Sequence, residues 1–163
     1  MRTKLFILLI LITQQAMSQM NFGTPPKDAI PEKLKNLKVE IEVVHFPKEN
    51  DPIKIDDIYY WKHSTAIMCK EREIKIIEYG AYLYYNDKWN LRKSYPLKDL
   101  DKTFGTINQT MLQAQPYVWV KNWRTDKNLY GGWAMWYFIG VDNKGITVCG
   151  YETVNTTNRL LNK

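Results

Sequence analysis

The sequence is poor in the residues and motifs on which most catalytic and metal centres depend. Its 163 residues include only two cysteines and two histidines. The zinc-protease pattern H-E-x-x-H, the nucleophile pattern G-x-S-x-G and the phosphate-binding pattern G-x-x-x-x-G-K-[ST] are all absent. The two cysteines stand far apart, so the C-x-x-C spacing of a redox motif is absent as well. We therefore expect a binding protein rather than an enzyme of these classes.

Charge is not concentrated in any part of the chain. Lys and Arg number 23 against 17 Asp and Glu, which gives a net charge of +6. There is no run of five or more basic residues and no arginine-rich stripe, features that nucleic-acid-binding proteins usually show. The sequence therefore argues against nucleic acid as a partner. A hydrophobic content of 45% with 13% aromatic residues argues against disorder and predicts a packed domain.

The apolar run near the N-terminus is too short to cross a bilayer. It covers residues 5–12, whereas a transmembrane helix needs about 20 apolar residues. The basic residues Arg2 and Lys4 precede it, and the small-x-small sequence of residues 16–18 follows it. This combination is typical of a secretory signal peptide. We predict cleavage after Ser18, export to the periplasm or the extracellular space, and no membrane span.

After the expected signal peptide, the distribution of proline and the alternation of apolar and polar residues indicate an N-terminal arm followed by a domain. Residues 21–36 contain three of the seven prolines and no sustained periodicity, so we expect an extended N-terminal arm over residues 19–37. Residues 38–46 alternate apolar and acidic side chains with period two, which indicates a strand that ends at Pro47. A single β-rich domain is expected over residues 38–163.

Most of the domain favours strands. Aromatic and β-branched residues are abundant, and turn residues separate them, as in the hairpin sequences at residues 86–88 and 142–145. We predict an all-β sandwich or barrel of about seven short antiparallel strands with one or two short helices, with a strand-rich α+β fold as the alternative. Further strands are expected over residues 56–70, 73–85, 89–95, 117–123, 131–141 and 146–154.

One helix has clear start and stop signals. Pro96 stands at a first-turn position, Leu97, Leu100 and Phe104 form an apolar stripe, and Gly105 follows. A second short helix is expected over residues 106–115.

The two cysteines are predicted to form a disulfide. Cys69 and Cys149 each lie in the middle of an expected strand, and an exported protein meets oxidising conditions.

The two histidines offer an alternative, a copper or zinc site. On a strand, His63 and Cys69 point to the same face but lie about 20 Å apart, so one metal ion cannot bind both. His45, from a neighbouring strand, with His63 and a carboxylate or Met68, is the ligand set that we consider. The main expectation is that these residues are structural, with no metal and no cofactor.

A ligand site is predicted in the segment from Trp119 to Trp133. This segment combines aromatic rings with charged and amide groups and ends at the flexible pair Gly131-Gly132, a mixture that suits recognition. Trp136 is assigned to the core because residues 133–139 are apolar on both faces. The predicted ligand-binding residues are Trp119, Lys121, Trp123, Arg124, Asp126 and Tyr130.

Three functional hypotheses follow. The first is a non-catalytic exported module that binds a glycan, a peptide, another protein or a small molecule. The second is a metal-binding or redox-linked protein that uses His45, His63 and the two thiols. The third is a small hydrolase with an acid and a base among the carboxylates. Those carboxylates are Asp56, Asp57, Glu71, Glu73, Glu78 and Glu152. The sequence gives no information on oligomeric state.

Overall fold

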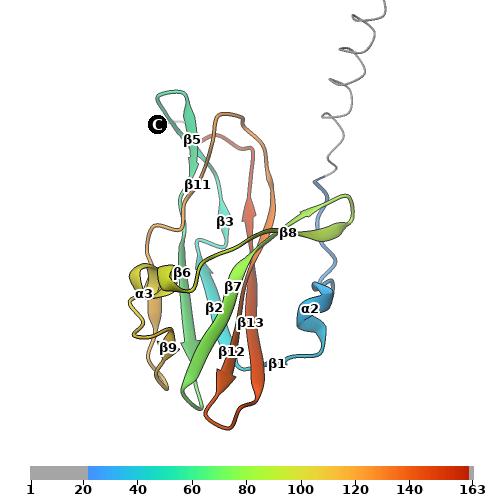
Figure 1. The fold of residues 1–163 in the computed structure, drawn as a ribbon. Helices are drawn as coiled ribbons and strands as arrows, with labels where there is room; N and C mark the ends of the chain where they lie inside the picture. Colours follow the sequence, from blue (N-terminus) through green and yellow to red (C-terminus); the bar gives the residue numbers. More distant parts are fainter. Residues whose placement is uncertain (1–21, 162–163) are drawn as a thin grey trace, which may run out of the picture.

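The computed structural model describes residues 22–161 of the chain (Figure 1). The expected signal peptide and the first residues of the expected arm lie outside this range and stay predictions. Among the described residues, no helix is long and apolar enough to cross a membrane.

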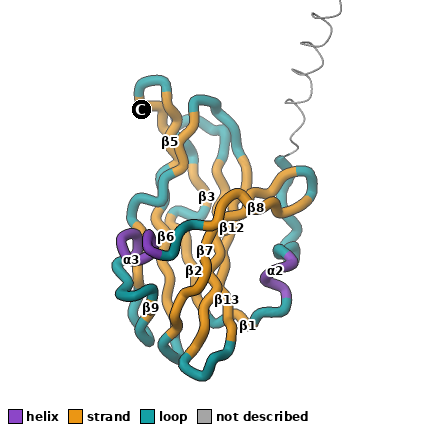
Figure 2. The backbone as a smooth tube through the Cα atoms, in the orientation of Figure 1, coloured by secondary structure: helices purple, strands orange, loops and turns teal. Residues whose placement is uncertain are grey.

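Strands dominate the architecture and confirm the predicted all-β class (Figure 2). The largest unit, here called the main sheet, has the strand order β1-β13-β12-β7-β8, with β3 added to β13 and β9 added to β7. Its long central strands pair antiparallel. The strands are β1 (Lys38–Val39), β3 (Glu49–Asn50), β7 (Ile74–Tyr85), β8 (Lys88–Ser94), β9 (Thr110–Met111), β12 (Gly132–Asp142) and β13 (Thr147–Thr156).

Two three-stranded sheets, here called the facing sheets, form a second layer. One has the order β10-β6-β2 and the other β11-β5-β4, with antiparallel pairing throughout. Strand segments are therefore more numerous than the seven expected, since several have only two or three residues. The strands are β2 (Ile41–Phe46), β4 (Ile53–Ile55), β5 (Ile58–Trp61), β6 (Ser64–Cys69), β10 (Tyr117–Trp119) and β11 (Arg124–Asp126).

The predicted strand over residues 38–46 connects the two layers. β1 pairs with β13 of the main sheet, and after Glu40 the chain continues as β2 in a facing sheet. At Gly150 the two layers lie very close together, because a Cβ added there would stand 2.2 Å from the carbonyl oxygen of Ile41. The alternation of β2, with Ile41 and Val43 buried and Glu42 exposed, agrees with the prediction.

The main sheet is covered on both faces. Its inner face packs against the facing sheet β10-β6-β2 and against α3 (Lys98–Phe104), through a core that includes Phe138, Val148 and Ile67. Its outer face carries a smaller core around Tyr137, which is covered by α2 (Glu32–Lys35) and its buried Leu34. The expected arm therefore contains a helical turn that packs against the sheet.

Helix α3 confirms the stripe prediction, because Leu100 and Phe104 are buried and Gly105 follows in the left-handed conformation, with φ of 79°. The second helix, expected over residues 106–115, is wrong. That segment contains the short strand β9 between turns, with Asn108, Gln109 and Ala114 at positive φ. Its apolar residues meet β7, so tertiary pairing decided the local structure.

The expected disulfide is not present, since Cys69 and Cys149 are both free and buried. Cys69 belongs to the inner core and Cys149 to the outer core, so the main sheet separates the two thiols. The error arose because strand context alone does not tell which face of which sheet a side chain meets.

Candidate functional site

The pairing within the facing layer is interrupted at a place that we call the bend: residues 62–64 opposite residues 120–123. On one side of it β6 pairs with β10 up to Thr65 and Trp119, and on the other β5 pairs with β11 from Trp61 and Arg124. Four residues stand opposite three, so the ladder cannot continue in register, in the manner of a bulge. Predicted continuous strands over residues 56–70 and 117–123 are therefore each broken here. Two side chains of the bend, His63 and Asn122, are buried, and two cavities lie next to it.

The inner cavity lies between the bend and the main sheet and has a volume of about 160 Å³. The main sheet presents a small side chain to this space. That side chain is Ala134 of β12, which pairs with Leu83 of β7 on one side and with Val154 of β13 on the other. Aromatic rings enclose the cavity, and the bend supplies polar groups. The lining residues are His63, Ala81, Leu83, Arg92, Tyr95, Trp119, Asn122, Trp123, Arg124, Thr125, Ala134, Trp136, Val154 and Thr156.

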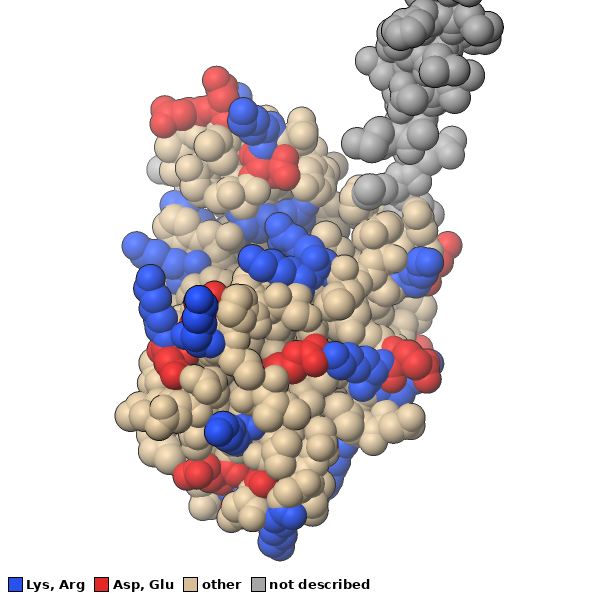
Figure 3. Space-filling view, in the orientation of Figure 1, with Lys and Arg blue, Asp and Glu red and all other residues tan. Residues whose placement is uncertain are grey.

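The outer depression is larger, about 720 Å³, and opens beside the inner cavity. The two are adjacent because Leu83, Arg92 and Arg124 line both. Figure 3 shows Lys and Arg side chains gathered on this face of the molecule at the height where β8 crosses it in Figure 1. The remaining lining residues are Phe22, Tyr85, Asn90, Leu91, Asn128, Tyr130, Gly132 and Trp133.

Arg124 is held in place by rings and by one hydrogen bond. Its guanidinium carbon lies 4.2 Å from the ring centroid of Tyr130 and 4.9 Å from that of Trp61, so it packs against both rings. Its Nη1 donates to Thr156 Oγ1 at 2.6 Å. A guanidinium that is fixed in this way has little rotamer freedom left to lose when it binds a ligand.

A chain of hydrogen bonds runs through the bend and fixes His45. Asn122 Nδ2 donates to Thr65 Oγ1 at 2.8 Å, and Thr65 Oγ1 lies 2.9 Å from His45 Nδ1. His45 Nε2 lies 3.1 Å from the carbonyl oxygen of Glu152, which can only accept, so Nε2 carries the proton. Thr65 then donates to Nδ1, and both nitrogens of His45 are occupied. Burial lowers the pKa of His45 to about 4.

His63 is in the opposite state. Its side chain is 5% exposed, and neither ring nitrogen has a hydrogen-bond partner among the described residues. Burial lowers its pKa to about 4, and the neighbouring His45 contributes in the same direction. The backbone of Trp61 opposes the shift but lies outside hydrogen-bond geometry with the ring. His63 is therefore a neutral imidazole with a free donor and a free acceptor at the wall of the inner cavity.

The structure brings the two histidines together but gives no metal site. Their ring centroids lie 5.6 Å apart. Both nitrogens of His45 are engaged, and among residues 22–161 no group of three or more His, Cys, Asp or Glu is placed to hold a metal ion. Met68 and His45 do not share a face of their sheet, since β2 and β6 alternate in burial.

Four of the predicted ligand-binding residues line the two cavities. Trp119 and Trp123 line the inner cavity, Tyr130 the outer depression, and Arg124 both. Asp126 instead shapes its own loop, since it accepts hydrogen bonds from Tyr130 Oη at 2.7 Å and from the backbone of Asn128 at 2.9 Å.

The last predicted residue, Lys121, lines neither cavity and lies 5.9 Å from the ring of Trp123. Trp136, assigned to the core, is buried there and also forms part of the cavity wall.

The sequence did not predict that Arg92, Asn122 and His63 line the inner cavity. Arg92 comes from β8, which the hairpin pairs with β7, and no local pattern indicates that its side chain meets the bend. The sequence predicted that His63 and Cys69 point to the same face of a strand, and both side chains are buried.

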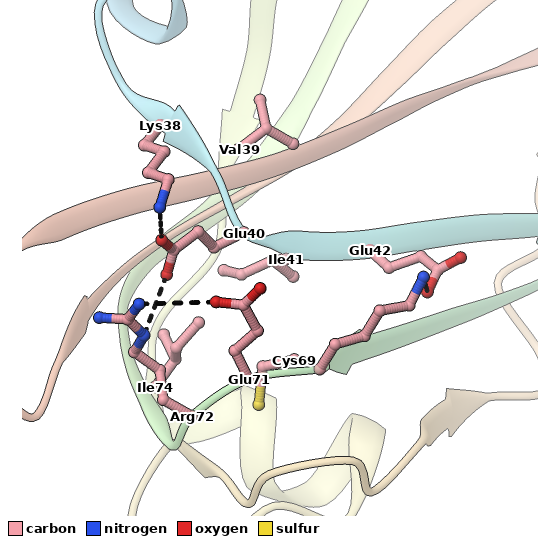
Figure 4. Close-up of a pocket in the computed structure, with 10 residues that line it drawn as sticks. Lys38, Val39, Glu40, Ile41, Glu42, Cys69, Glu71, Arg72 and Ile74 are labelled. Atoms are coloured by element: carbon pink, nitrogen blue, oxygen red, sulfur yellow. Dashed lines mark ion pairs between the residues drawn. The ribbon is translucent and has the colours of Figure 1, made fainter.

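A third hollow, shown in Figure 4, lies between β2 and the turn after β6 and is lined by charged side chains that are paired with one another. Arg72 Nη1 donates to the buried carboxylate of Asp142 at 2.7 Å, and its Nε lies 3.4 Å from Glu40 Oε2. Lys38 Nζ lies 2.5 Å from Glu40 Oε1, and Lys70 Nζ 3.0 Å from a carboxylate oxygen of Glu42. These charges compensate each other, so this hollow is a structural ion-pair network.

Comparison of the chain with protein-family models, with curated proteins and with solved structures gives no match.

Proposed function

We propose that the protein is a non-catalytic binding protein that holds a small molecule in the inner cavity and the outer depression. The observation that carries the proposal is the adjacency of two cavities with complementary linings: a polar inner one with Asn122 and His63, and an outer one rich in rings. Small-molecule sites in proteins usually combine an apolar wall with a few fixed polar groups.

The lining does not favour catalysis. No Asp, Glu, Cys or Ser is among the described residues that line either cavity, so the commonest nucleophiles and a carboxylate acid and base are missing from this wall. His63 is the histidine of the lining, but its pKa is lowered to about 4, so it stays neutral near pH 7, and no described side chain orients its ring by a hydrogen bond.

Filling the inner cavity tests the proposal. The tryptophans of the lining allow intrinsic fluorescence to report occupancy during titration with a panel of small acids and their neutral analogues. We expect saturable binding with one site per chain, and Ala134→Leu should weaken it at least about tenfold, because the added atoms occupy the floor of the cavity.

Ala66→Leu is the matched control, because Ala66 is also a half-buried strand alanine and lines neither cavity. Binding that Ala134→Leu leaves unchanged would place the ligand elsewhere and contradict the proposal.

A further inference from the structure

The two cavities carry two positive charges and no negative one. Arg92 and Arg124 are the charged residues of the linings. Neither forms an ion pair with another described residue, although many other charges of the chain do. Asp126 is close in sequence to Arg124, but its carboxylate lies beyond ion-pair distance and is engaged by Tyr130. The charge of the site is therefore complementary to an anion.

An unpaired and buried polar side chain stands in the same cavity. His63 is 5% exposed, and neither of its ring nitrogens has a hydrogen-bond partner among residues 22–161. Buried polar groups in folded proteins nearly always have a partner. His63 is thus suited to bond a polar atom of a molecule that enters the inner cavity, and as a neutral imidazole it offers one N–H donor to an oxygen.

The outer depression has a different character. Its wall carries the rings of Phe22, Tyr85, Tyr130 and Trp133. Phe22 stacks on Tyr130 with a centroid distance of 5.9 Å, so the first described residue of the chain helps to form this wall. Such a surface accepts an aromatic or aliphatic group.

We propose that the ligand is a small organic acid, with its carboxylate in the inner cavity at Arg92, Arg124 and His63 and its apolar body in the outer depression. This inference rests on the proposed function and names its ligand class. The guanidinium fork matches the two oxygens of a carboxylate, and Arg124 is already fixed by its ring contacts and by Thr156. The inner volume of about 160 Å³ accommodates a carboxylate with at most about one six-membered ring.

Acids and their amides of equal shape test the ligand class. The purified protein is titrated by calorimetry with benzoate, 2-naphthoate and octanoate, and in parallel with benzamide, 2-naphthamide and octanamide. At least one acid should bind about tenfold or more tightly than its amide. Arg92→Gln should remove this preference, and His63→Leu should reduce it, because each takes away a group that bonds the carboxylate.

The matched control is Lys88→Gln, which removes the same charge from the same strand at a residue that lines neither cavity. Equal affinities for acid and amide would overturn the anion assignment and leave the proposed function standing. Absence of binding by all six compounds at millimolar concentration would overturn both. An equal loss in Arg92→Gln and Lys88→Gln would also overturn the assignment, because it would indicate attraction by overall charge.

Discussion

At the scale of single residues, two neighbouring imidazoles meet different surroundings. His45 is bonded at both nitrogens, to Thr65 and to the backbone of Glu152, whereas His63 is bonded at neither. Both are buried, and burial lowers both pKa values to about 4. One histidine therefore stabilises the bend, and the other is available to a ligand.

The lowered pKa values predict sensitivity to acid. A histidine whose folded pKa lies below its ordinary value near 6.5 takes up its proton on unfolding. Its contribution to stability is complete above about pH 6.5 and is lost as the pH falls towards 4, on the order of 3 kcal/mol for each histidine. Urea unfolding between pH 7 and pH 4 measures this loss.

His63→Leu should reduce the number of protons taken up on unfolding in that interval by about one. The NMR titration of the histidine rings provides an independent measurement. A pKa near 6.5 for both rings in the folded protein would contradict the burial argument.

The thiols give a second prediction at this scale. Burial raises the pKa of Cys149 to about 11 and also raises that of Cys69, so little thiolate is present near neutral pH. Alkylation of the native protein should be slow at both residues, and two thiols should react in denaturant. Intact-mass analysis after alkylation gives the count. A linked Cys69–Cys149 peptide under non-reducing conditions would instead support the crosslink expected from the sequence.

At the scale of elements, the sequence correctly predicted the features that depend on neighbouring residues alone. The alternation of β2, the hairpin turns at Asn86 and Asp87, and the stop at Gly105 all agree with the structure. The bend was not predicted because residues 62–64 include no strand breaker. The interruption arises because four residues of the opposing segment face these three. The register between two strands that are distant in the chain cannot be read from the sequence of either strand alone.

The contact between the layers gives a prediction for Gly150. In Gly150→Ala the new Cβ would stand 2.2 Å from the carbonyl oxygen of Ile41, so β13 and β2 must separate. We expect a loss of roughly 2 kcal/mol or more in the free energy of unfolding, in the range of overpacked cores. Chemical denaturation measures it.

Gly145→Ala is the matched control, since Gly145 has a φ of 79° with nothing within 4 Å of an added Cβ. Its cost should be about 1 kcal/mol, the penalty of the left-handed conformation alone. Equal losses in the two variants would show that the close approach to Ile41 does not matter.

At the scale of the whole molecule, the site depends on long-range arrangement. The sequence indicated the segment from Trp119 to Trp133 because it combines aromatic rings with charged and amide groups. It did not indicate Arg92 or Ala134, which reach the same cavity from β8 and β12 only after the sheets have packed. Export is untouched by these observations and stays a prediction, which N-terminal analysis of the secreted form can test.

The most direct test of the account follows the indole N–H signals of the six tryptophans by NMR while 2-naphthoate is added. Trp119, Trp123, Trp133 and Trp136 line the two cavities, whereas the indole of Trp89 donates to the backbone of Ala29 and lines neither. We expect saturable shifts of the lining tryptophans and an unchanged Trp89 signal. Shifts confined to Trp89, or none at all at saturating naphthoate, would contradict it.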